Sequence, residues 1–166
     1  MLEVTGQIAL VPPFFESFRK RLTRSPKIYL LDSGLACHLL GIETDRQLSR
    51  SPFLGPLFEG FVASEIIKQQ VNAGRRRELY HFRDQQGLEV DFVVPRRADE
   101  LLLIEAKASR TVRPAMADAL LRLVRAARGR TRGVVVHPGD DAGTTASALR
   151  PGVRALPLGK LLDELR

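Results

Sequence analysis

The stretches Leu88-Glu89-Val90-Asp91-Phe92-Val93-Val94 and Leu101-Leu102-Leu103-Ile104-Glu105-Ala106-Lys107 decide the fold of this chain. Each is a mostly apolar run with charged residues at two alternate positions, a pattern that predicts a β-strand. Side chains on a strand alternate between faces, so the two acids of the first stretch project together, as do the glutamate and lysine of the second. Burying a charge is costly unless it is paired or holds a metal. The two strands therefore predict a divalent-cation site.

Composition indicates an ordinary globular chain with an excess of positive charge. The 166 residues are 44% hydrophobic and 27% charged, enough for one domain with a genuine core. The 26 Lys and Arg residues exceed the 19 Asp and Glu residues, for a formal charge of +7. Such an excess favours a polyanionic partner such as DNA. Because the excess is nearly all arginine, codon bias is the alternative explanation.

Cysteine usage and hydropathy restrict the location of the protein. Cys37 is the single cysteine, which excludes an internal disulfide and a cysteine-based zinc site and fits a reducing cytoplasm. No apolar run approaches the roughly 20 residues that span a membrane, and the N-terminus lacks the features of a signal peptide. We therefore expect a soluble cytoplasmic protein without a membrane partner.

Around the two charged strands, the patterns predict the order helix, strand, strand, strand, helix, strand. Residues 56–72 carry apolar side chains at three- and four-residue steps, which is typical of a helix, and residues 78–82 predict a strand. A second amphipathic helix begins at Pro114, and residues 133–137 form a short buried strand. Three consecutive strands can form an antiparallel meander, and the second helix brings the next strand in parallel. We expect an α/β fold with a mixed central sheet flanked by helices.

The chain divides into an N-terminal extension, residues 1–52, and a main domain, residues 53–166. The extension is expected to hold an arm, or the tail of a preceding domain, over residues 1–26. A strand at residues 27–31 and a short helix that Asp32 or Ser33 caps and Gly41 closes are expected to follow. Residues 43–56 contain Gly and Pro among polar residues, so we expect a connection there. A further strand near residues 153–156 and a helix from Leu158 end the main domain.

The carboxylates of Asp91 and Glu105 are the expected metal ligands. Mg²⁺ prefers oxygen ligands and keeps several waters, so one or two carboxylates suffice to hold it, and Mn²⁺ is an alternative. The backbone carbonyl of Ala106 can supply a third oxygen. Lys107 shares a face with Glu105, where its ammonium can position a water or stabilise charge on a phosphate. Glu89 is a further ligand or, as we favour, the partner of a neighbouring arginine.

This arrangement resembles the PD-(D/E)XK, or restriction-endonuclease-like, nuclease superfamily, with Asp91 as the first acid and Glu105-Ala106-Lys107 as the Glu-x-Lys motif. The resemblance implies an αβββαβ core and a Mg²⁺-dependent nuclease site in which Asp91, Glu105 and Lys107 are catalytic. Many members add a glutamate from the first core helix, and here Glu59 and Glu65 are the alternatives. They point about 120° apart on an ideal helix, so only one can reach the site, and we favour Glu59. No Pro precedes Asp91, which weakens the match.

A closer resemblance covers nearly the whole chain and rests on four blocks, residues 27–36, 55–62, 89–93 and 104–109. They resemble the uncharacterised C-terminal domain attached to a group of prokaryotic AAA-type ATPases. The phosphate loop of such an ATPase is absent here. We therefore expect a fragment or truncated relative whose first 18 residues match the connector after the ATPase part.

Two functions from different classes follow from these resemblances. The first is a divalent-metal-dependent nuclease acting on DNA. The second is an inactive nuclease-like module that binds DNA or protein and serves the ATPase domain; an oligomer contact is a weaker third possibility. Arg75, Arg76, Arg77 and Arg110 are the expected phosphate contacts, although a solvated turn explains the arginine run equally well.

Overall fold

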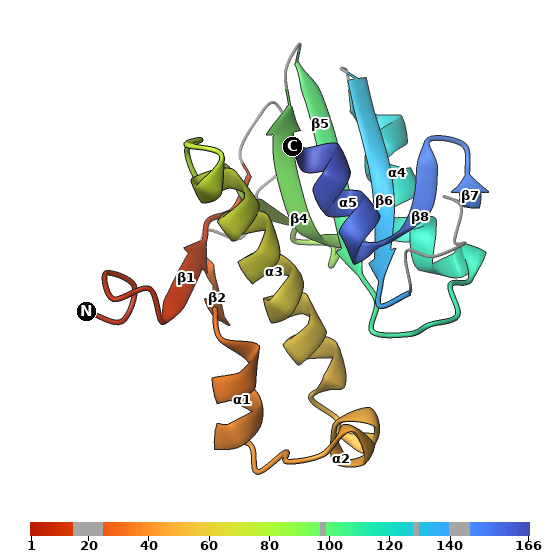
Figure 1. Cartoon of the computed structure of the whole chain (residues 1–166). Coiled ribbons are helices and arrows are strands. Elements are labelled where there is room, and N and C mark those ends of the chain that lie inside the picture. Colours follow the sequence, from red (N-terminus) through yellow and green to blue (C-terminus); the bar gives the residue numbers. More distant parts are fainter. Residues whose placement is uncertain (15–24, 97–98, 128–129, 140–146) are drawn as a thin grey trace.

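The two charged stretches form neighbouring strands, β4 (Glu89–Arg96) and β5 (Glu100–Ala106), of one mixed sheet. The computed structural model describes residues 1–14, 25–96, 99–127, 130–139 and 147–166, and within these ranges the sheet has six strands in the order β3-β4-β5-β6-β8-β7 (Figure 1). The first three strands form the expected antiparallel meander, and β6 and β8 run parallel to β5. The other strands are β3 (Tyr80–Arg83), β6 (Arg130–His137), β7 (Ser147–Arg150) and β8 (Val153–Pro157). The mixed sheet predicted from the sequence is confirmed.

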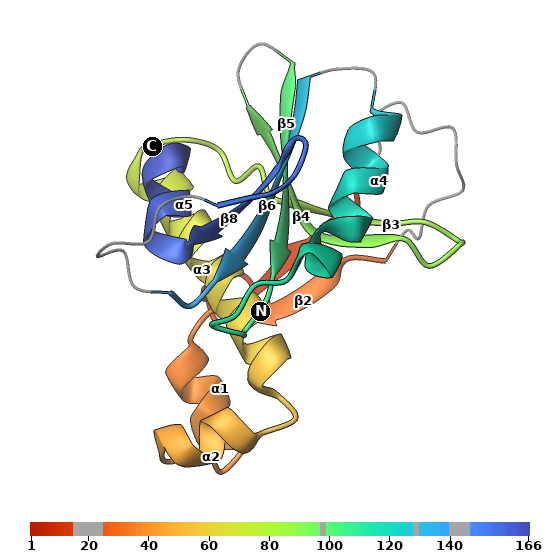
Figure 2. The ribbon, with the colours of Figure 1, turned by 90° about the vertical axis from the view of Figure 1, so that its right-hand side faces the viewer.

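Helices cover both faces of this sheet. Helices α3 (Leu54–Asn72) and α5 (Leu158–Leu165) lie on one face, and a 3₁₀ turn η1 (Pro114–Ala117) leads into α4 (Asp118–Ala126) on the other (Figures 1 and 2). Phe92 and Ile104 pack in the core beneath α3, whereas Val93 and Leu103 pack in the core beneath α4. These neighbours in each strand point to opposite faces, as the strand period requires. No helix among the described residues has the length and apolar character needed to cross a membrane.

Part of the arm that we expected over residues 1–26 forms a strand instead, and residues 15–24 lie outside the described residues. β1 (Ile8–Val11) pairs antiparallel with β2 (Lys27–Leu30), and Val11 and Tyr29 are buried in the same core as α3. Beyond β1, Pro13 bridges His81 on the edge of β3. The prediction of an arm is therefore wrong for Ile8–Val11. A four-residue strand is too short to show a clear period, and its partner is distant in sequence.

The predicted short helix is confirmed as α1 (Ser33–Leu39), where the Asp32 carboxylate accepts the Leu35 N–H at 2.9 Å. Residues 43–56 contain a further helix, α2 (Asp45–Arg50), so our expectation of a connection is wrong there. A capping box between Thr44 and Gln47 begins α2 and satisfies N–H groups that its first turn leaves unpaired. No residue of α2 is buried, which explains why its sequence has no repeating apolar positions that would predict a helix.

An irregular pairing of β3 with β4 shapes the region around Asp91. Tyr80 pairs with Val93 and Phe82 pairs with Val90, so two residues of β4 lie opposite the single residue between them on β3. This extra residue is a β-bulge, a feature that bends a strand and re-aims its side chains, often beside active sites. The bulge falls on Asp91 and Phe92, where the candidate site lies.

Candidate functional site

Four carboxylates converge at one end of the sheet, and we call them the acidic cluster: Glu59, Glu89, Asp91 and Glu105. Glu59 comes from α3, the next two from β4 and the last from β5. A lysine from β2 lies among them. The Lys27 Nζ atom is 2.7 Å from Glu89, 2.9 Å from Glu59 and 3.5 Å from Asp91. The structure thus joins three elements around one ammonium group.

Asp91 and Glu105 lie side by side, as predicted for neighbouring strands. The register pairs Phe92 with Ile104, which places Asp91 across from Glu105. The Ala106 N–H donates to Asp91 Oδ2 at 2.9 Å, and Lys107 Nζ donates to Glu105 Oε1 at 2.7 Å. The structure therefore brings together both predicted metal-ligand carboxylates and the lysine of the Glu-x-Lys motif. The proposed ligand role of the Ala106 carbonyl stays a prediction.

Crowding of buried carboxylates raises the pKa of the two central acids. Burial, with Glu105 and Glu59 nearby, raises the pKa of Asp91 to about 7. Burial also raises the pKa of Glu105, although the hydrogen bond from Lys107 opposes the rise. Without further positive charge, the cluster therefore disfavours full ionisation.

The pKa values of Lys27 and Lys107 are raised as well, which for a lysine favours the charged form. Burial lowers the pKa of Lys27, but Glu89, Glu59 and Asp91 more than offset it, so the pKa is raised. Burial likewise opposes a rise in the pKa of Lys107 that Glu105 causes. Both ammonium groups are thus held in the charged form by the carboxylates around them.

The structure distinguishes the two helix glutamates. Glu59 accepts hydrogen bonds from Lys27 and from the buried Tyr29 hydroxyl, and it lies where α3 passes close to β2. Glu65 instead pairs with Lys68 on the exposed side of α3 at 2.7 Å. The favoured residue, Glu59, is the one that joins the cluster, while Glu65 lies elsewhere on the helix.

The structure also assigns partners to other residues predicted from the sequence. Glu89 pairs with Lys27 at 2.7 Å and with Arg83 at 3.8 Å, so the ion pair that we favoured is confirmed. The Arg75 guanidinium donates to the Leu165 carbonyl at the end of α5, which gives it a structural contact. The other predicted phosphate contacts are exposed: Arg76, Arg77 and Arg110.

Lys27 and Tyr29 are site residues that the sequence reasoning missed. Lys27 lies in a predicted strand but 64 positions before Asp91, so no local spacing joins them. Tyr29 was recognised in the sequence only as part of a predicted strand, with no role in the site. Its burial and the carboxylate of Glu59 raise its pKa, so it stays a neutral hydrogen-bond donor.

The acidic cluster fits a divalent cation in its chemistry. Glu105 Oε2 is buried and has no hydrogen-bond partner among the described residues, which leaves one carboxylate oxygen available. In the part of the chain that the structure describes, no group of three or more Asp, Glu, His or Cys side chains has the arrangement of a complete metal-binding site. That matches Mg²⁺ better than zinc, since Mg²⁺ keeps most of its waters and needs only one or two carboxylates. Asp91 and Glu105 are the residues that would hold it.

Comparison with known proteins places the chain in a family. Residues 54–161 match the description Domain of unknown function (DUF4143), a domain found in ATPase-associated proteins. The chain belongs to the DUF4143 family. Residues 1–46 match a second description, Domain of unknown function (DUF8612).

Two curated relatives of this DUF4143 protein are uncharacterised proteins of Mycobacterium bovis and Mycobacterium tuberculosis. Each is 36% identical over 133 residues, which cover 77% of this chain but 27% of the relative. The chain thus spans about a quarter of their length. No solved structure gave a significant match.

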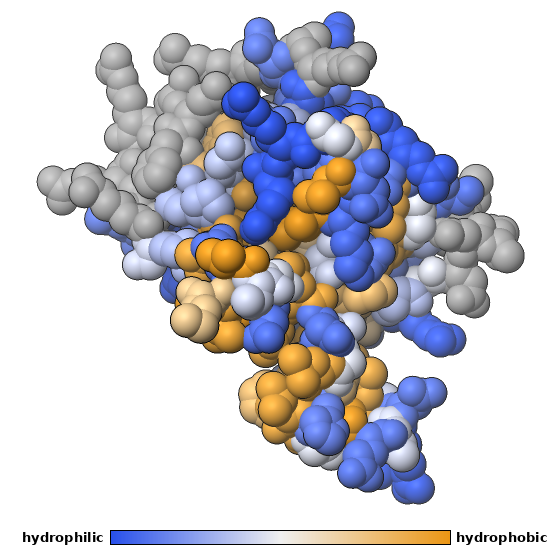
Figure 3. Space-filling model, turned by 60° about the vertical axis from the view of Figure 1, so that its left-hand side comes forward, coloured by the Kyte–Doolittle hydropathy of each residue, from blue (hydrophilic) through white to orange (hydrophobic). Residues whose placement is uncertain are grey.

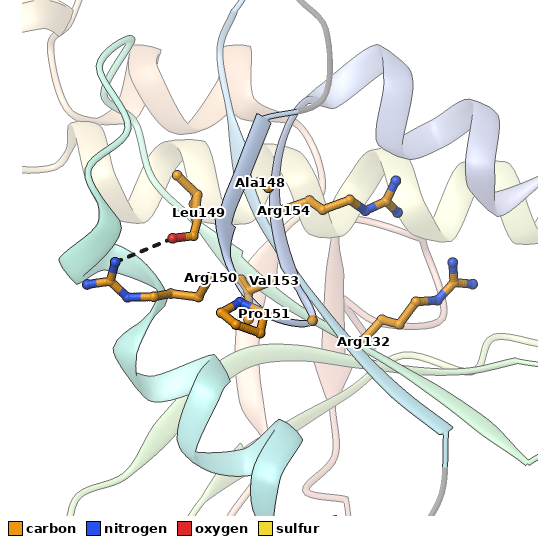
Figure 4. A pocket seen from close by; sticks show the side chains of 8 residues that line it. Arg132, Ala148, Leu149, Arg150, Pro151, Val153 and Arg154 are labelled. Carbon is orange, nitrogen blue, oxygen red and sulfur yellow. Dashed lines mark hydrogen bonds between the residues drawn. The ribbon is translucent and has the colours of Figure 1, made fainter.

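A basic pocket lies at the other end of the DUF4143 sheet, between β6, β7 and β8. It has a volume of about 560 Å³ and contains three arginines, Arg132, Arg150 and Arg154. Figure 4 shows Arg132 and Arg154 extending to the same side of the ribbon and Arg150 to the other. Arg132 pairs with Glu100, and Arg154 pairs with Glu164 at 2.9 Å. Sequence periodicity gave no sign of this pocket.

An apolar groove adjoins the acidic cluster. It has a volume of about 320 Å³ between α1, β2 and the start of α3, and Tyr29 and Glu59 line both the groove and the cluster. Exposed apolar side chains surround it, and apolar residues gather on this face of the molecule (Figure 3). They include Ile28, Leu39, Leu40 and Phe53.

Proposed function

We propose that this DUF4143 domain is a divalent-metal-dependent phosphodiesterase that cleaves DNA and has a restriction-endonuclease-like core. The observation that carries the proposal is the convergence of Glu59 from α3, Asp91 from β4, Glu105 from β5 and Lys107 from the residues directly after β5. The element order α3, β3, β4, β5, α4, β6 supports the αβββαβ core that the resemblance implies.

The residues divide the chemistry among them. Mg²⁺ or Mn²⁺, when bound, polarises the phosphate and lowers the pKa of a bound water. Asp91 and Glu105 would hold the cation, and the hydrogen bond from the Ala106 N–H orients the Asp91 carboxylate. Lys107 lies 2.7 Å from Glu105, where its ammonium can offset charge that develops on a phosphate oxygen. Glu59 completes the cluster on the helix side.

A nicking assay tests the proposal. Supercoiled plasmid and single-stranded DNA are incubated with wild-type protein and Lys107→Ala in Mg²⁺ or Mn²⁺. We expect metal-dependent nicking by the wild type and a loss of roughly 10²-fold or more in the variant, because one preorganised charge contributes about that much. Absence of nicking by both proteins with either metal would overturn the nuclease proposal.

The basic pocket, together with Arg76, Arg77 and Arg110, supplies the proposed contacts to DNA phosphates. Arg150→Ala combined with Arg154→Ala should weaken binding uniformly across DNA sequences and reduce the salt dependence of log K by about one for each phosphate that the protein no longer neutralises. Filter binding or anisotropy at several salt concentrations measures this slope. The matched control is Arg122→Ala combined with Arg125→Ala on α4, which removes equal charge elsewhere. Equal slopes in both double variants would exclude the pocket from the DNA interface.

The second proposed function is a non-catalytic module that serves an ATPase part of a longer protein. Two observations favour it. Lys27 already lies among the carboxylates, and exposed apolar side chains line the groove beside the cluster, where a protein partner could bind. DNA binding without metal, unchanged in Lys107→Ala and without nicking, would support this module over the nuclease.

A further inference from the structure

We propose that Lys27 is an internal counter-cation of the acidic cluster and competes with the divalent ion for the negative charge of that cluster, in which it contacts the proposed metal ligand Asp91. The inference rests on the proposed metal site and extends it to a residue from outside the Glu-x-Lys motif. Removing the Lys27 charge is therefore expected to tighten cation binding while it destabilises the metal-free protein.

The contacts of the Lys27 ammonium carry this inference. An ammonium group has three hydrogens, and Lys27 Nζ lies within 3.5 Å of three carboxylates, those of Glu89, Glu59 and Asp91. Its side chain is 23% exposed, so the pairs are only partly screened by solvent. A surface lysine usually has one exposed partner, as Lys68 has in Glu65. Lys27 instead neutralises carboxylates from both α3 and β4.

The hairpin holds Lys27 in this place. β2 pairs along its length with β1, and Tyr29, two residues after Lys27, is buried and bonded to Glu59. The backbone at Lys27 is thus anchored, whereas its long flexible side chain can turn away. A divalent ion at Asp91 would place two further positive charges next to the ammonium, and the ion and the ammonium would repel each other.

The charge count explains why both cations are attracted. The acidic cluster has four carboxylates, and Lys27, Lys107 and Arg83, the last 3.8 Å from Glu89, supply three positive charges against them. The remaining negative charge attracts a divalent ion, while each positive charge already present weakens that attraction. Lys107 contacts only the Glu105 side of the cluster among the described ion pairs, so Lys27 is the competitor at Asp91 and Glu59.

The test compares Lys27→Met with wild type in two measurements on the full chain, the Kd for Mn²⁺ by calorimetry and urea unfolding in EDTA. We expect Mn²⁺ to bind Lys27→Met at least about tenfold more tightly, and the urea midpoint in EDTA to fall. Lys68→Met, which removes the exposed ion pair with Glu65 on α3, is the matched control. It should change neither the Kd for Mn²⁺ nor the urea midpoint appreciably. Lys27→Gln gives the same comparison if Lys27→Met does not fold in EDTA.

The outcomes separate this inference from the nuclease proposal. Equal Mn²⁺ affinities in wild type and both neutral variants would overturn competition by Lys27, even if the wild type nicks DNA. If Lys27 had only a structural role, its replacement would lower stability and weaken Mn²⁺ binding together. That result would also overturn the inference. Tighter Mn²⁺ binding without nicking would support the inference and count against the nuclease. No Mn²⁺ binding by any protein would overturn both.

Discussion

Glu105→Gln is expected to reduce metal-dependent DNA cleavage by about 10²-fold or more, because it removes one of two proposed ligand charges. Polarisation by a bound metal contributes several kcal/mol, and each 1.4 kcal/mol lost is roughly a tenfold loss in rate. Glutamine keeps the shape of the side chain and can still accept the hydrogen bond from Lys107. The fold should therefore survive, and initial nicking rates at saturating Mn²⁺ report the loss.

Asp163→Asn serves as the control for this variant. Asp163 is an exposed acid on α5 that pairs with Arg166, far along the chain from the proposed ligands. Its replacement also removes one carboxylate charge, and cleavage should remain as in the wild type. Full activity in Glu105→Gln would remove Glu105 from the reaction and with it the Glu-x-Lys interpretation.

Asp91 is expected to make the metal-free protein less stable as the pH rises from about 4 to about 7. Burial and the nearby Glu105 and Glu59 raise the pKa of Asp91 from 3.8 to about 7 in the folded chain. Between these values the folded state binds more protons than the unfolded state, so the free energy of unfolding falls with rising pH. The contribution of this one group is about 4 kcal/mol across the window, since one pKa unit corresponds to about 1.4 kcal/mol.

Urea unfolding in EDTA at several pH values measures this effect. Asp91→Asn cannot ionise, so its stability should decline less over the same range and should exceed that of the wild type near pH 7. Mn²⁺ should restore the wild type but not the variant, because the cation favours the ionised carboxylate. Parallel pH profiles for both proteins would show that Asp91 ionises normally in the fold.

The sequence predicted those site residues whose positions follow from strand alternation and from short connections between neighbouring elements. Asp91 and Glu105 lie on consecutive strands of a meander, so alternation and strand order together place them side by side. Lys107 lies directly after β5, two residues beyond Glu105, and helix geometry allows only one of Glu59 and Glu65 to reach the site. These relations depend on period and on short connections, which a single sequence displays.

Lys27 and Tyr29 depend on a different kind of information. They reach the cluster because β2 packs against α3, and that packing joins residues 30 or more positions apart. Short exposed elements were missed for a related reason. α2 buries no residue and β7 has only four, so neither carries enough apolar periodicity to be recognised.

The ion network around Lys27 joins two regions that match separate family descriptions, residues 1–46 and residues 54–161. The lysine belongs to the first region and its three carboxylate partners to the second. The positive charge of the first region therefore balances negative charge of the second. In a chimera, an N-terminal region with a neutral residue at position 27 would leave the acids of the second region without this counter-charge, so the metal-free chimera is expected to be less stable than a chain whose lysine and carboxylates come from the same relative.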